Sequence, residues 1–510
     1  MDSPILSSAQ MRAAEEAAFS RGVKVETLMD QAGAGVAHAI QQFFPNPGTC
    51  VVFAGKGHNG GDALVAATHL QRLGWTIDLR LPFPEENCGE LTRKKLQVFR
   101  DAESGRGLSA PSPGRTGTIA ALRPLPHSRA VVLDGLLGTG AKSFLREPIR
   151  TAAREINRLR REQNAFVFAL DLPTGLDTDS GERDPEDCVL ADFTVAIGFA
   201  KHGLIVDEVL DIVGRLEVVP LVDLAPEVTL RNELAATAHS LNPLLPRRKF
   251  SAYKNQFGRI GVVAGSKGFI GAALMTTQGA LRAGAGLVEV FVPEEIYDIV
   301  ASAAPVESMV KPVRKYRDLL EEKIDIWALG PGLGKSRAPE ILNLIENAQQ
   351  PMIVDADGLN IVADKVDILQ RCRGPRLLTP HPGEMQRLFE VGKMARAGIA
   401  RNFCEQYPVT LLLKGSRTIV CERGKAISYN TTGNPGMASG GMGDVLTGVC
   451  AGLAGRKLSP YDAARIGAWV CGRAAEMSIF YSGASEESLL ASDVLDHLGA
   501  AFNEMRNPII

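Results

Sequence analysis

The sequence has little net charge and few aromatic side chains. Its 510 residues carry a formal net charge of −2 and are 6% aromatic, which gives no indication of binding to nucleic acid or to an acidic membrane surface. No apolar run is long enough to span a membrane. The first residues, Met1-Asp-Ser-Pro, lack the basic start and apolar core of a signal peptide. We therefore expect neither nucleic acids nor membranes among its partners.

The sequence also lacks paired cysteines. The eight cysteines are scattered without a CxxC pair, and all but Cys88 lie in or near expected helices and strands. This spacing favours buried thiols in a reduced, cytoplasmic protein over a disulfide framework or a zinc site.

Length and periodicity predict two domains. A chain of 510 residues is too long for one ordinary core. Apolar strands alternate with helical segments in two runs, a pattern typical of parallel sheets covered by helices. The proline-rich segment 226–246 is interpreted as a connector. The sequence thus predicts an α/β protein with two three-layer domains, 1–225 and 247–510. Strands are expected at 49–54, 77–81, 130–134, 165–171, 193–198, 259–264, 287–292, 326–329, 351–355, 377–379, 410–414 and 418–421.

The most informative segment is Asn434-Pro-Gly-Met-Ala-Ser-Gly-Gly-Met-Gly-Asp444, which precedes an expected helix. Its glycines let the backbone approach a ligand closely, and the free N–H groups of a helix start attract phosphate oxygens. A carboxylate there would repel phosphate, so its expected task is to take a proton from a neighbouring hydroxyl. The segment predicts phosphoryl transfer with Asp444 as the base.

Four other loops of the second half, at 265–273, 330–334, 379–384 and 414–418, are weak signals when taken singly. Lys414 has the charge to reach a phosphate, and His381 stands between two prolines. A simple turn or a rigid loop residue is the alternative for each of them.

In the first half, the loop Gly55-Lys-Gly-His-Asn-Gly-Gly-Asp62 joins an expected strand to an expected helix. It formally matches GxGxxG, a weak signal, and a tight turn is the alternative. Asn59, Asp134 and Thr174 follow three different strands, so their oxygens are expected to meet at one sheet edge and suit a hard cation. Capping or turn formation is the alternative for each residue alone.

Together, four motifs of the first half resemble the NAD(P)HX epimerases, the YjeF N-terminal domain type, over about residues 1–225. The motifs are Gly57-His-Asn-Gly-Gly-Asp62, Asp134-Gly-Leu-Leu-Gly-Thr-Gly140, Asp171-Leu-Pro-Thr-Gly175 and Lys201-His-Gly-Leu204. The resemblance implies a Rossmann-like sheet that binds a hydrated nicotinamide nucleotide and a potassium ion. His58 stands where Asn is usual, and Thr174 where Ser is usual.

The resemblance also implies roles for individual residues. Asn59, Asp134 and Thr174 would bind K⁺, while Asp171 and Lys201 are candidates for moving the proton. A solvated loop lysine is the alternative for Lys201. The nucleotide would contact His58, Asn59, Gly60, Gly61, Asp62, Gly138, Thr139, Gly140, Ala141, Lys142, Ser143, Phe144 and Asp171.

The second half resembles the ADP-dependent NAD(P)HX dehydratases, the YjeF C-terminal domain type with a ribokinase-like fold. The match covers about 235–505 and is most specific at the segment that ends in Asp444, where Met442 replaces the usual Thr. The resemblance implies ADP as co-substrate, to which Mg²⁺ is a reasonable addition through the phosphates. Phosphates would be held by Lys414, Gly415, Ser416, Arg417, Thr418 and Gly443, and the hydrated nicotinamide would face Ala272, Gly332, His381 and Asp444.

Three hypotheses follow for the whole chain. The first is a bifunctional repair enzyme that epimerises R and S forms of NAD(P)HX and dehydrates the S form with ADP, releasing AMP and phosphate. The second is a ribokinase-like vitamin kinase with an accessory nucleotide-binding domain. In the third, the first half is a non-catalytic binding module, although the retained Asn59, Asp134 and Asp171 argue against a decayed site. A homo-oligomer is expected; ADP against ATP preference stays open.

Overall fold

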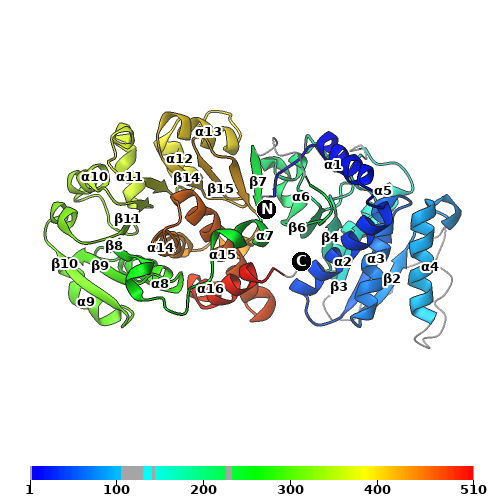
Figure 1. Ribbon diagram of the computed structural model, residues 1–510, viewed down its shortest axis with the longest axis horizontal. Coiled ribbons are helices and arrows are strands. Elements are labelled where there is room, and N and C mark those ends of the chain that lie inside the picture. The colour runs from blue at the N-terminus through cyan, green and yellow to red at the C-terminus, as the bar shows by residue number, and fades with distance from the viewer. Residues whose placement is uncertain (1–2, 105–129, 141–143, 226–231, 509–510) are drawn as a thin grey trace. The chain divides into compact units, whose positions relative to one another are not determined.

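The computed structural model describes residues 3–104, 130–140, 144–225 and 232–508. The chain divides into two compact units, one formed mainly by Ser3–Arg231 and the other mainly by Asn232–Pro508. Both are sheets covered by helices (Figure 1). The predicted fold class, α/β with two domains, is confirmed.

The first unit is built on a six-stranded sheet in the order β2-β1-β3-β4-β5-β6, with every neighbouring pair parallel. The order reverses between β1 and β3, and ligands of open α/β sheets bind at such a point, beyond the carboxyl ends of the strands. The strands are β1 (Thr49–Ala54), β2 (Thr76–Arg80), β3 (Ala130–Gly135), β4 (Phe166–Leu170), β5 (Phe193–Ile197) and β6 (Arg215–Val219).

Helices cover both faces of this sheet. On β4, Val167 packs in one core cluster with Ile156 of α5 (Ile149–Gln163). The next residue, Phe168, meets Phe43 of α2 (Val25–Phe43), with ring centroids 6.4 Å apart. Because successive strand residues point to opposite faces, α5 and α2 lie on opposite sides. The remaining helices are α1 (Ser8–Ser20), α3 (His58–Arg72), α4 (Glu90–Ser104) and α6 (Leu210–Val213).

The second unit is built on a ten-stranded sheet in the order β10-β9-β8-β11-β12-β13-β14-β15-β16-β7. Its pairs are parallel except that β15 runs antiparallel to both β14 and β16. The strands are β7 (Glu233–Ala236), β8 (Arg259–Val263), β9 (Leu287–Pro293), β10 (Ser308–Val313), β11 (Ile326–Leu329), β12 (Met352–Val354), β13 (Arg376–Leu378), β14 (Thr410–Leu413), β15 (Ile419–Glu422) and β16 (Ile427–Asn430).

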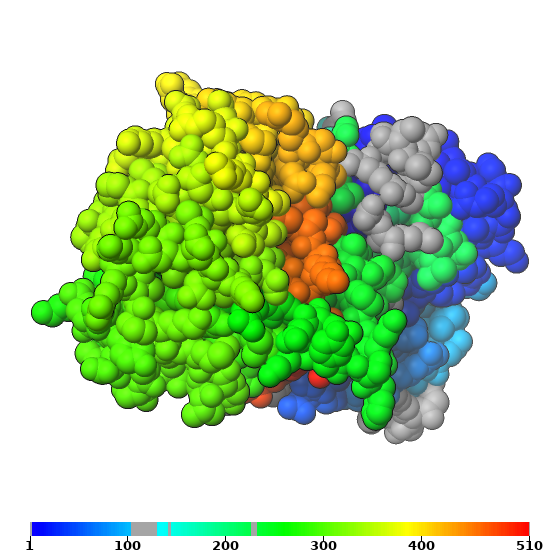
Figure 2. All heavy atoms as spheres, turned by 60° about the vertical axis from the view of Figure 1, so that its left-hand side comes forward, coloured from blue at the N-terminus to red at the C-terminus, as the bar shows by residue number. Residues whose placement is uncertain are grey.

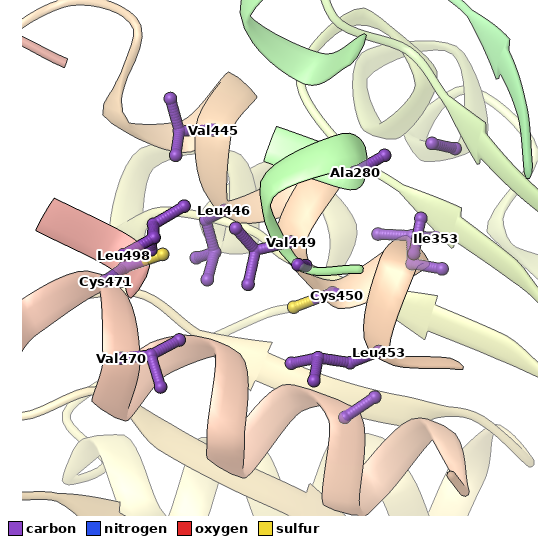
Figure 3. Packing of buried hydrophobic residues seen from close by; sticks show 14 of the residues in the cluster. Ala280, Ile353, Val445, Leu446, Val449, Cys450, Leu453, Val470, Cys471 and Leu498 are labelled. Carbon is purple, nitrogen blue, oxygen red and sulfur yellow. The ribbon is translucent and has the colours of Figure 1, made fainter. Parts of the chain in front are cut away.

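One face of this sheet carries α8 (Ile270–Arg282), α14 (Met442–Ala454), α15 (Pro460–Tyr481) and α16 (Ala491–Arg506). Figure 3 shows Val449 and Cys450 of α14 packed among side chains from the neighbouring helices and from β12. This apolar packing holds α14 in place. It therefore also fixes the N-terminus of α14, where the motif ending in Asp444 lies. The other helices are α7 (Ala238–Leu241), α9 (Tyr297–Ala303), α10 (Ala338–Asn347), α11 (Asp357–Ala363), α12 (Pro382–Leu388) and α13 (Arg396–Gln406).

The segment expected to be a connector is largely folded. Residues Glu233–Ala236 form β7, which pairs in parallel with β16, and α7 follows it. The two units divide between Arg231 and Asn232, so 232–246 belongs to the second unit, which corrects the connector prediction. The prolines of this segment suggested a linker. Instead, the buried residues Leu234-Ala-Ala236 form an edge strand of the sheet by pairing with β16, which is distant in sequence. Residues 226–231 lie outside the described part of the chain.

Strands β6, β10 and β16 were also not predicted. Arg215 and Glu217 break the apolar run of β6, which lies at the edge of its sheet. Within the described residues, no helix combines the length and apolar character needed to cross a bilayer. All eight cysteines are free thiols and seven are buried, as the sequence predicts.

Candidate active sites

In the first unit, the loops that follow β1, β3 and β4 meet at the point where the strand order reverses. Asn59, in the first turn of α3, donates from its side-chain amide to the carbonyl oxygens of Leu137 (2.9 Å) and Leu170 (3.3 Å). Leu137 follows β3 and Leu170 ends β4. One side chain therefore ties three loops together.

Asp134 and Thr174 complete this cluster, and both are fully buried. The Asp134 carboxylate accepts hydrogen bonds from the Thr174 amide (2.9 Å) and hydroxyl (2.8 Å) and from the Leu136 amide (3.2 Å). Burial raises the pKa of Asp134 to about 6, although these hydrogen bonds act in the opposite direction. All three donor groups are neutral, so the buried charge has no cationic partner among the described residues. The structure thus brings the predicted trio together.

Beside the trio lies a buried ion pair between Asp171 and Lys201. Asp171 has a positive φ of 70° and accepts from the Thr139 hydroxyl (2.6 Å) and the Ile197 amide (3.2 Å). Burial acts to raise the pKa of Asp171, but Lys201 and these hydrogen bonds hold it below its ordinary value. Lys201 is fully buried and also donates to the Ile197 carbonyl (2.9 Å). The alternative of a solvated loop lysine is therefore wrong.

Asp62 has the opposite character. Burial and the neighbouring carboxyls of Asp171, Glu15 and Asp30 raise its pKa well above the ordinary value. One carboxyl that favours its proton thus lies near another that favours its charge, an arrangement typical of acid–base chemistry. Glu15 comes from α1 and was missed, because nothing in an amphipathic helix marks one glutamate among several.

The other predicted nucleotide contacts differ in exposure. His58, Gly140 and Phe144 are exposed, and Gly138 and Thr139 are partly exposed. Gly60 and Gly61 are buried in the first turn of α3. Ala141, Lys142 and Ser143 lie outside the described residues.

In the second unit, the predicted substrate residues Ala272 and Gly332 are in contact. The Ser266 hydroxyl donates to the Gly332 carbonyl (2.7 Å), which joins the loops after β8 and β11. Gly332 has φ +64°, and a Cβ there would lie 3.0 Å from the Ala272 Cβ and 2.9 Å from the Phe269 Cβ. Only glycine permits this approach. Phe269, 63% exposed, borders the pair.

His381 caps α12. Its Nδ1 accepts from the amides of Gly383 (3.0 Å) and Glu384 (3.3 Å). The ring is about half exposed, and its Nε2 lies 3.6 Å from a Glu384 oxygen. When the imidazole is neutral, its proton is therefore on Nε2. His381 is both a rigid capping residue and a donor at the carboxyl end of β13.

The predicted phosphate loop is the hairpin turn between β14 and β15. The Lys414 ammonium lies 2.8 Å from an Asp355 oxygen and 3.8 Å from a Glu384 oxygen. Gly415 and Ser416 are exposed and Thr418 is partly so, whereas Arg417 is only 3% exposed. The Arg417 side chain therefore points into the protein rather than out of the loop.

Asp444 lies in the first turn of α14, close to Lys414. Burial and the Asp355 carboxylate raise the pKa of Asp444 to about 6, and Lys414 partly offsets them. Ala438, Ser439 and Gly440, just before the helix, are exposed. In Figure 2 the orange part of the chain, which contains this segment, reaches the surface between green and yellow segments of its unit. A ligand can therefore reach the helix start from solvent.

Three residues of this cluster, Asp355, Glu384 and Thr447, were not predicted as site residues. Asp355 directly follows β12, as Asp171 directly follows β4, and Asp134 is the penultimate residue of β3. The same signal, an acid at the carboxyl end of a buried strand, could have found it. Nothing local marks Thr447 within an apolar helix.

Two family models match separate parts of the chain. Residues 25–203 match the YjeF-related protein N-terminus. Residues 260–496 match NAD(P)H-hydrate dehydratase.

Curated relatives align with almost the whole chain. A protein of Moorella thermoacetica, named bifunctional NAD(P)H-hydrate repair enzyme Nnr, is 35% identical over 505 residues, 92% of this chain and 91% of the relative. An Escherichia coli protein of the same name is 33% identical over 509 residues, 96% of this chain and 92% of the relative.

Among solved structures, an ADP/ATP-dependent NAD(P)H-hydrate dehydratase from Bacillus subtilis, co-crystallized with ATP/Mg²⁺, is 28% identical. The match covers 53% of this chain and 97% of the Bacillus subtilis chain, with a TM-score of 0.46. Because relatives at 35% and 33% identity align over nearly the full length, and both halves match their own family model, the chain belongs to the bifunctional NAD(P)H-hydrate repair enzymes.

Proposed function

We propose that the two activities of this family are divided between the two units. The first unit interconverts the R and S forms of NAD(P)HX, and the second dehydrates the S form to NAD(P)H with ADP, releasing AMP and phosphate. The observation that carries the proposal is the placement of Asp444, with a pKa near 6, beside Lys414 at the start of α14.

The proposed chemistry of the second unit avoids the loss of hydroxide, which is a poor leaving group. Asp444 is ionised at neutral pH and accepts the proton of the C6 hydroxyl. That oxygen attacks the β-phosphoryl group of ADP, and AMP departs. The ring nitrogen lone pair then expels phosphate from C6, and a proton leaves C5 to form the double bond. Lys414 and the amides of the helix start balance the phosphate charge.

Magnesium is expected to arrive with the nucleotide. The described residues contain no group of three or more His, Cys, Asp or Glu side chains arranged to hold a metal ion. This fits Mg²⁺ bound mainly through phosphate oxygens, with few protein ligands. When bound, it would neutralise phosphate charge.

In the first unit, we propose that Asn59, Asp134 and Thr174 hold K⁺. The support is the fully buried Asp134 carboxylate, whose neutral hydrogen-bond donors leave its charge uncompensated. The ion would supply that charge and fix the loops that meet there. Asp171 and Lys201 would then give and take the proton as the C6 hydroxyl leaves one face of the ring and returns to the other.

The proposed function has a direct assay. NADHX mixed with ADP and the protein should regain nicotinamide absorbance, and NADPHX should do the same. No recovery, together with a stable phosphorylated product from a vitamin alcohol, would instead support the ribokinase-like vitamin kinase.

Removing K⁺ is expected to slow epimerisation and to spare dehydration. Both rates are measured on one preparation, by chiral separation of the epimers and by nicotinamide absorbance, in K⁺ and in a tetramethylammonium buffer. Thr174→Val should mimic the loss, whereas Thr174→Ser keeps the hydroxyl and serves as the control. Equal slowing of both reactions would contradict separate sites, and unchanged epimerisation would contradict the K⁺ site.

We also propose a cytoplasmic location and a homo-oligomer. The eight free thiols support a reducing compartment. The oligomer stays a prediction that light scattering in solution would check.

A further inference from the structure

Asp355 connects two parts of the second unit's site. It is 1% exposed and directly follows β12. One carboxylate oxygen accepts from the Lys414 ammonium (2.8 Å), and the other accepts from the Thr447 hydroxyl (2.8 Å). Lys414 belongs to the loop after β14, and Thr447 belongs to α14. A single buried carboxylate therefore clamps the phosphate loop to the helix that carries Asp444.

The start of α14 lies close to Asp355 and Lys414. A Cβ at Gly443 would lie 3.3 Å from an Asp355 oxygen and 3.4 Å from the Lys414 nitrogen. The distance to Asp355 is tighter than most Cβ contacts, so a side chain here would require a shift of a few tenths of an ångström. Thr447 lies three residues after Asp444, and residues at that spacing share one helix face. The clamp and the base thus face the same way.

The carboxylates of Asp355 and Glu384 keep the Lys414 side chain protonated and orient its ammonium group. Burial acts to lower the pKa of Lys414, but the carboxylates of Asp355 and Glu384 raise it above the ordinary value. An ammonium has three donors. Asp355 takes one of these donors at 2.8 Å, and the nearest Glu384 oxygen lies 3.8 Å away, beyond hydrogen-bond distance. Donors of the ammonium therefore remain for a nucleotide phosphate.

We propose that Asp355 is a positioning residue of the dehydration reaction, which holds Lys414 toward the nucleotide phosphates and the first turn of α14 toward the substrate hydroxyl. The inference rests on the proposed function of the second unit. Asp355 touches neither substrate nor phosphate in this role and acts through Lys414, Thr447 and the charge on Asp444.

The test is Asp355→Asn, which keeps the size of the side chain and removes its charge. Asp444 then loses a neighbouring negative charge, so its pKa falls and it stays ionised to lower pH. The acidic limb of the kcat–pH profile, expected near pH 6 in the native protein, should move down by about one unit. The plateau should fall by about tenfold because the base is weaker, and the KM for ADP should rise as Lys414 loses its anchor.

Two further variants make the experiment decisive. Thr447→Val cuts one arm of the clamp but keeps the charge, so kcat should fall several-fold with the acidic limb unmoved. Asp364→Asn makes the same chemical change on an exposed side chain of the same unit and should behave like the native protein. Circular dichroism and the epimerase rate report the folding of each variant.

Several outcomes would overturn the inference. One is an Asp355→Asn protein with the native acidic limb, and another is one with the native KM for ADP. Should Asp355→Asn fail to fold, native kcat in Thr447→Val would contradict the clamp. If the native protein itself fails to dehydrate NADHX with ADP, it is the proposed function that fails.

Discussion

Replacing Asp444 by asparagine is expected to lower the turnover of dehydration by about 100- to 10,000-fold, the range that a positioned base contributes. Asparagine keeps the shape of the side chain but cannot accept the hydroxyl proton. In the proposed site, the phosphate contacts come from Lys414 and from backbone amides at the start of α14, so binding of ADP should change little. Turnover is measured by the return of nicotinamide absorbance, and ADP affinity by titration calorimetry.

The same chain supplies the control for this prediction. Epimerisation belongs to the other unit and should proceed at the native rate in Asp444→Asn. Glutamate at this position restores the carboxylate with one extra methylene and should recover part of the activity. A near-native rate of dehydration in Asp444→Asn would show that Asp444 is not the base.

Replacing Lys201 by methionine is expected to lower the free energy of unfolding of the first unit by about 3–5 kcal/mol, because one partner of a buried ion pair is lost. Both side chains of the pair are nearly inaccessible, 1% for Lys201 and 11% for Asp171. Among the described residues, the remaining Asp171 carboxylate would keep only neutral donors, from Thr139 and Ile197. Hydrogen exchange of β4 and β5 peptides under increasing denaturant measures the effect.

The double variant Lys201→Met with Asp171→Asn separates this cause from a packing defect. Removing both charges should recover much of the lost free energy, since no uncompensated charge remains. Exchange in α14 peptides should stay native, because they belong to the other unit. A loss below about 1 kcal/mol in Lys201→Met, the value of an exposed pair, would show that the pair carries no buried charge.

The motif that ends in Asp444 shows which part of a site local sequence can predict. The motif ending in Asp444 needed only its own glycines and the helix after it to suggest a phosphate cradle with a base. The pKa of Asp444 near 6 depends first on burial and then on Asp355, which is 89 residues away in sequence. The sequence could therefore suggest Asp444 as the base without indicating how far its pKa is shifted.

The sequence by itself determined the α/β class, most strands of both sheets and the glycine loops, because these follow from local periodicity and from backbone freedom. It could not place β7, whose four residues gain their stability only by pairing with β16. It could not decide whether Lys201 is solvated, since Asp171, the partner that compensates its buried charge, follows a different strand. Only the tertiary structure decided which charges are compensated, because burial and the distance to partners from remote strands set the energy of a charge.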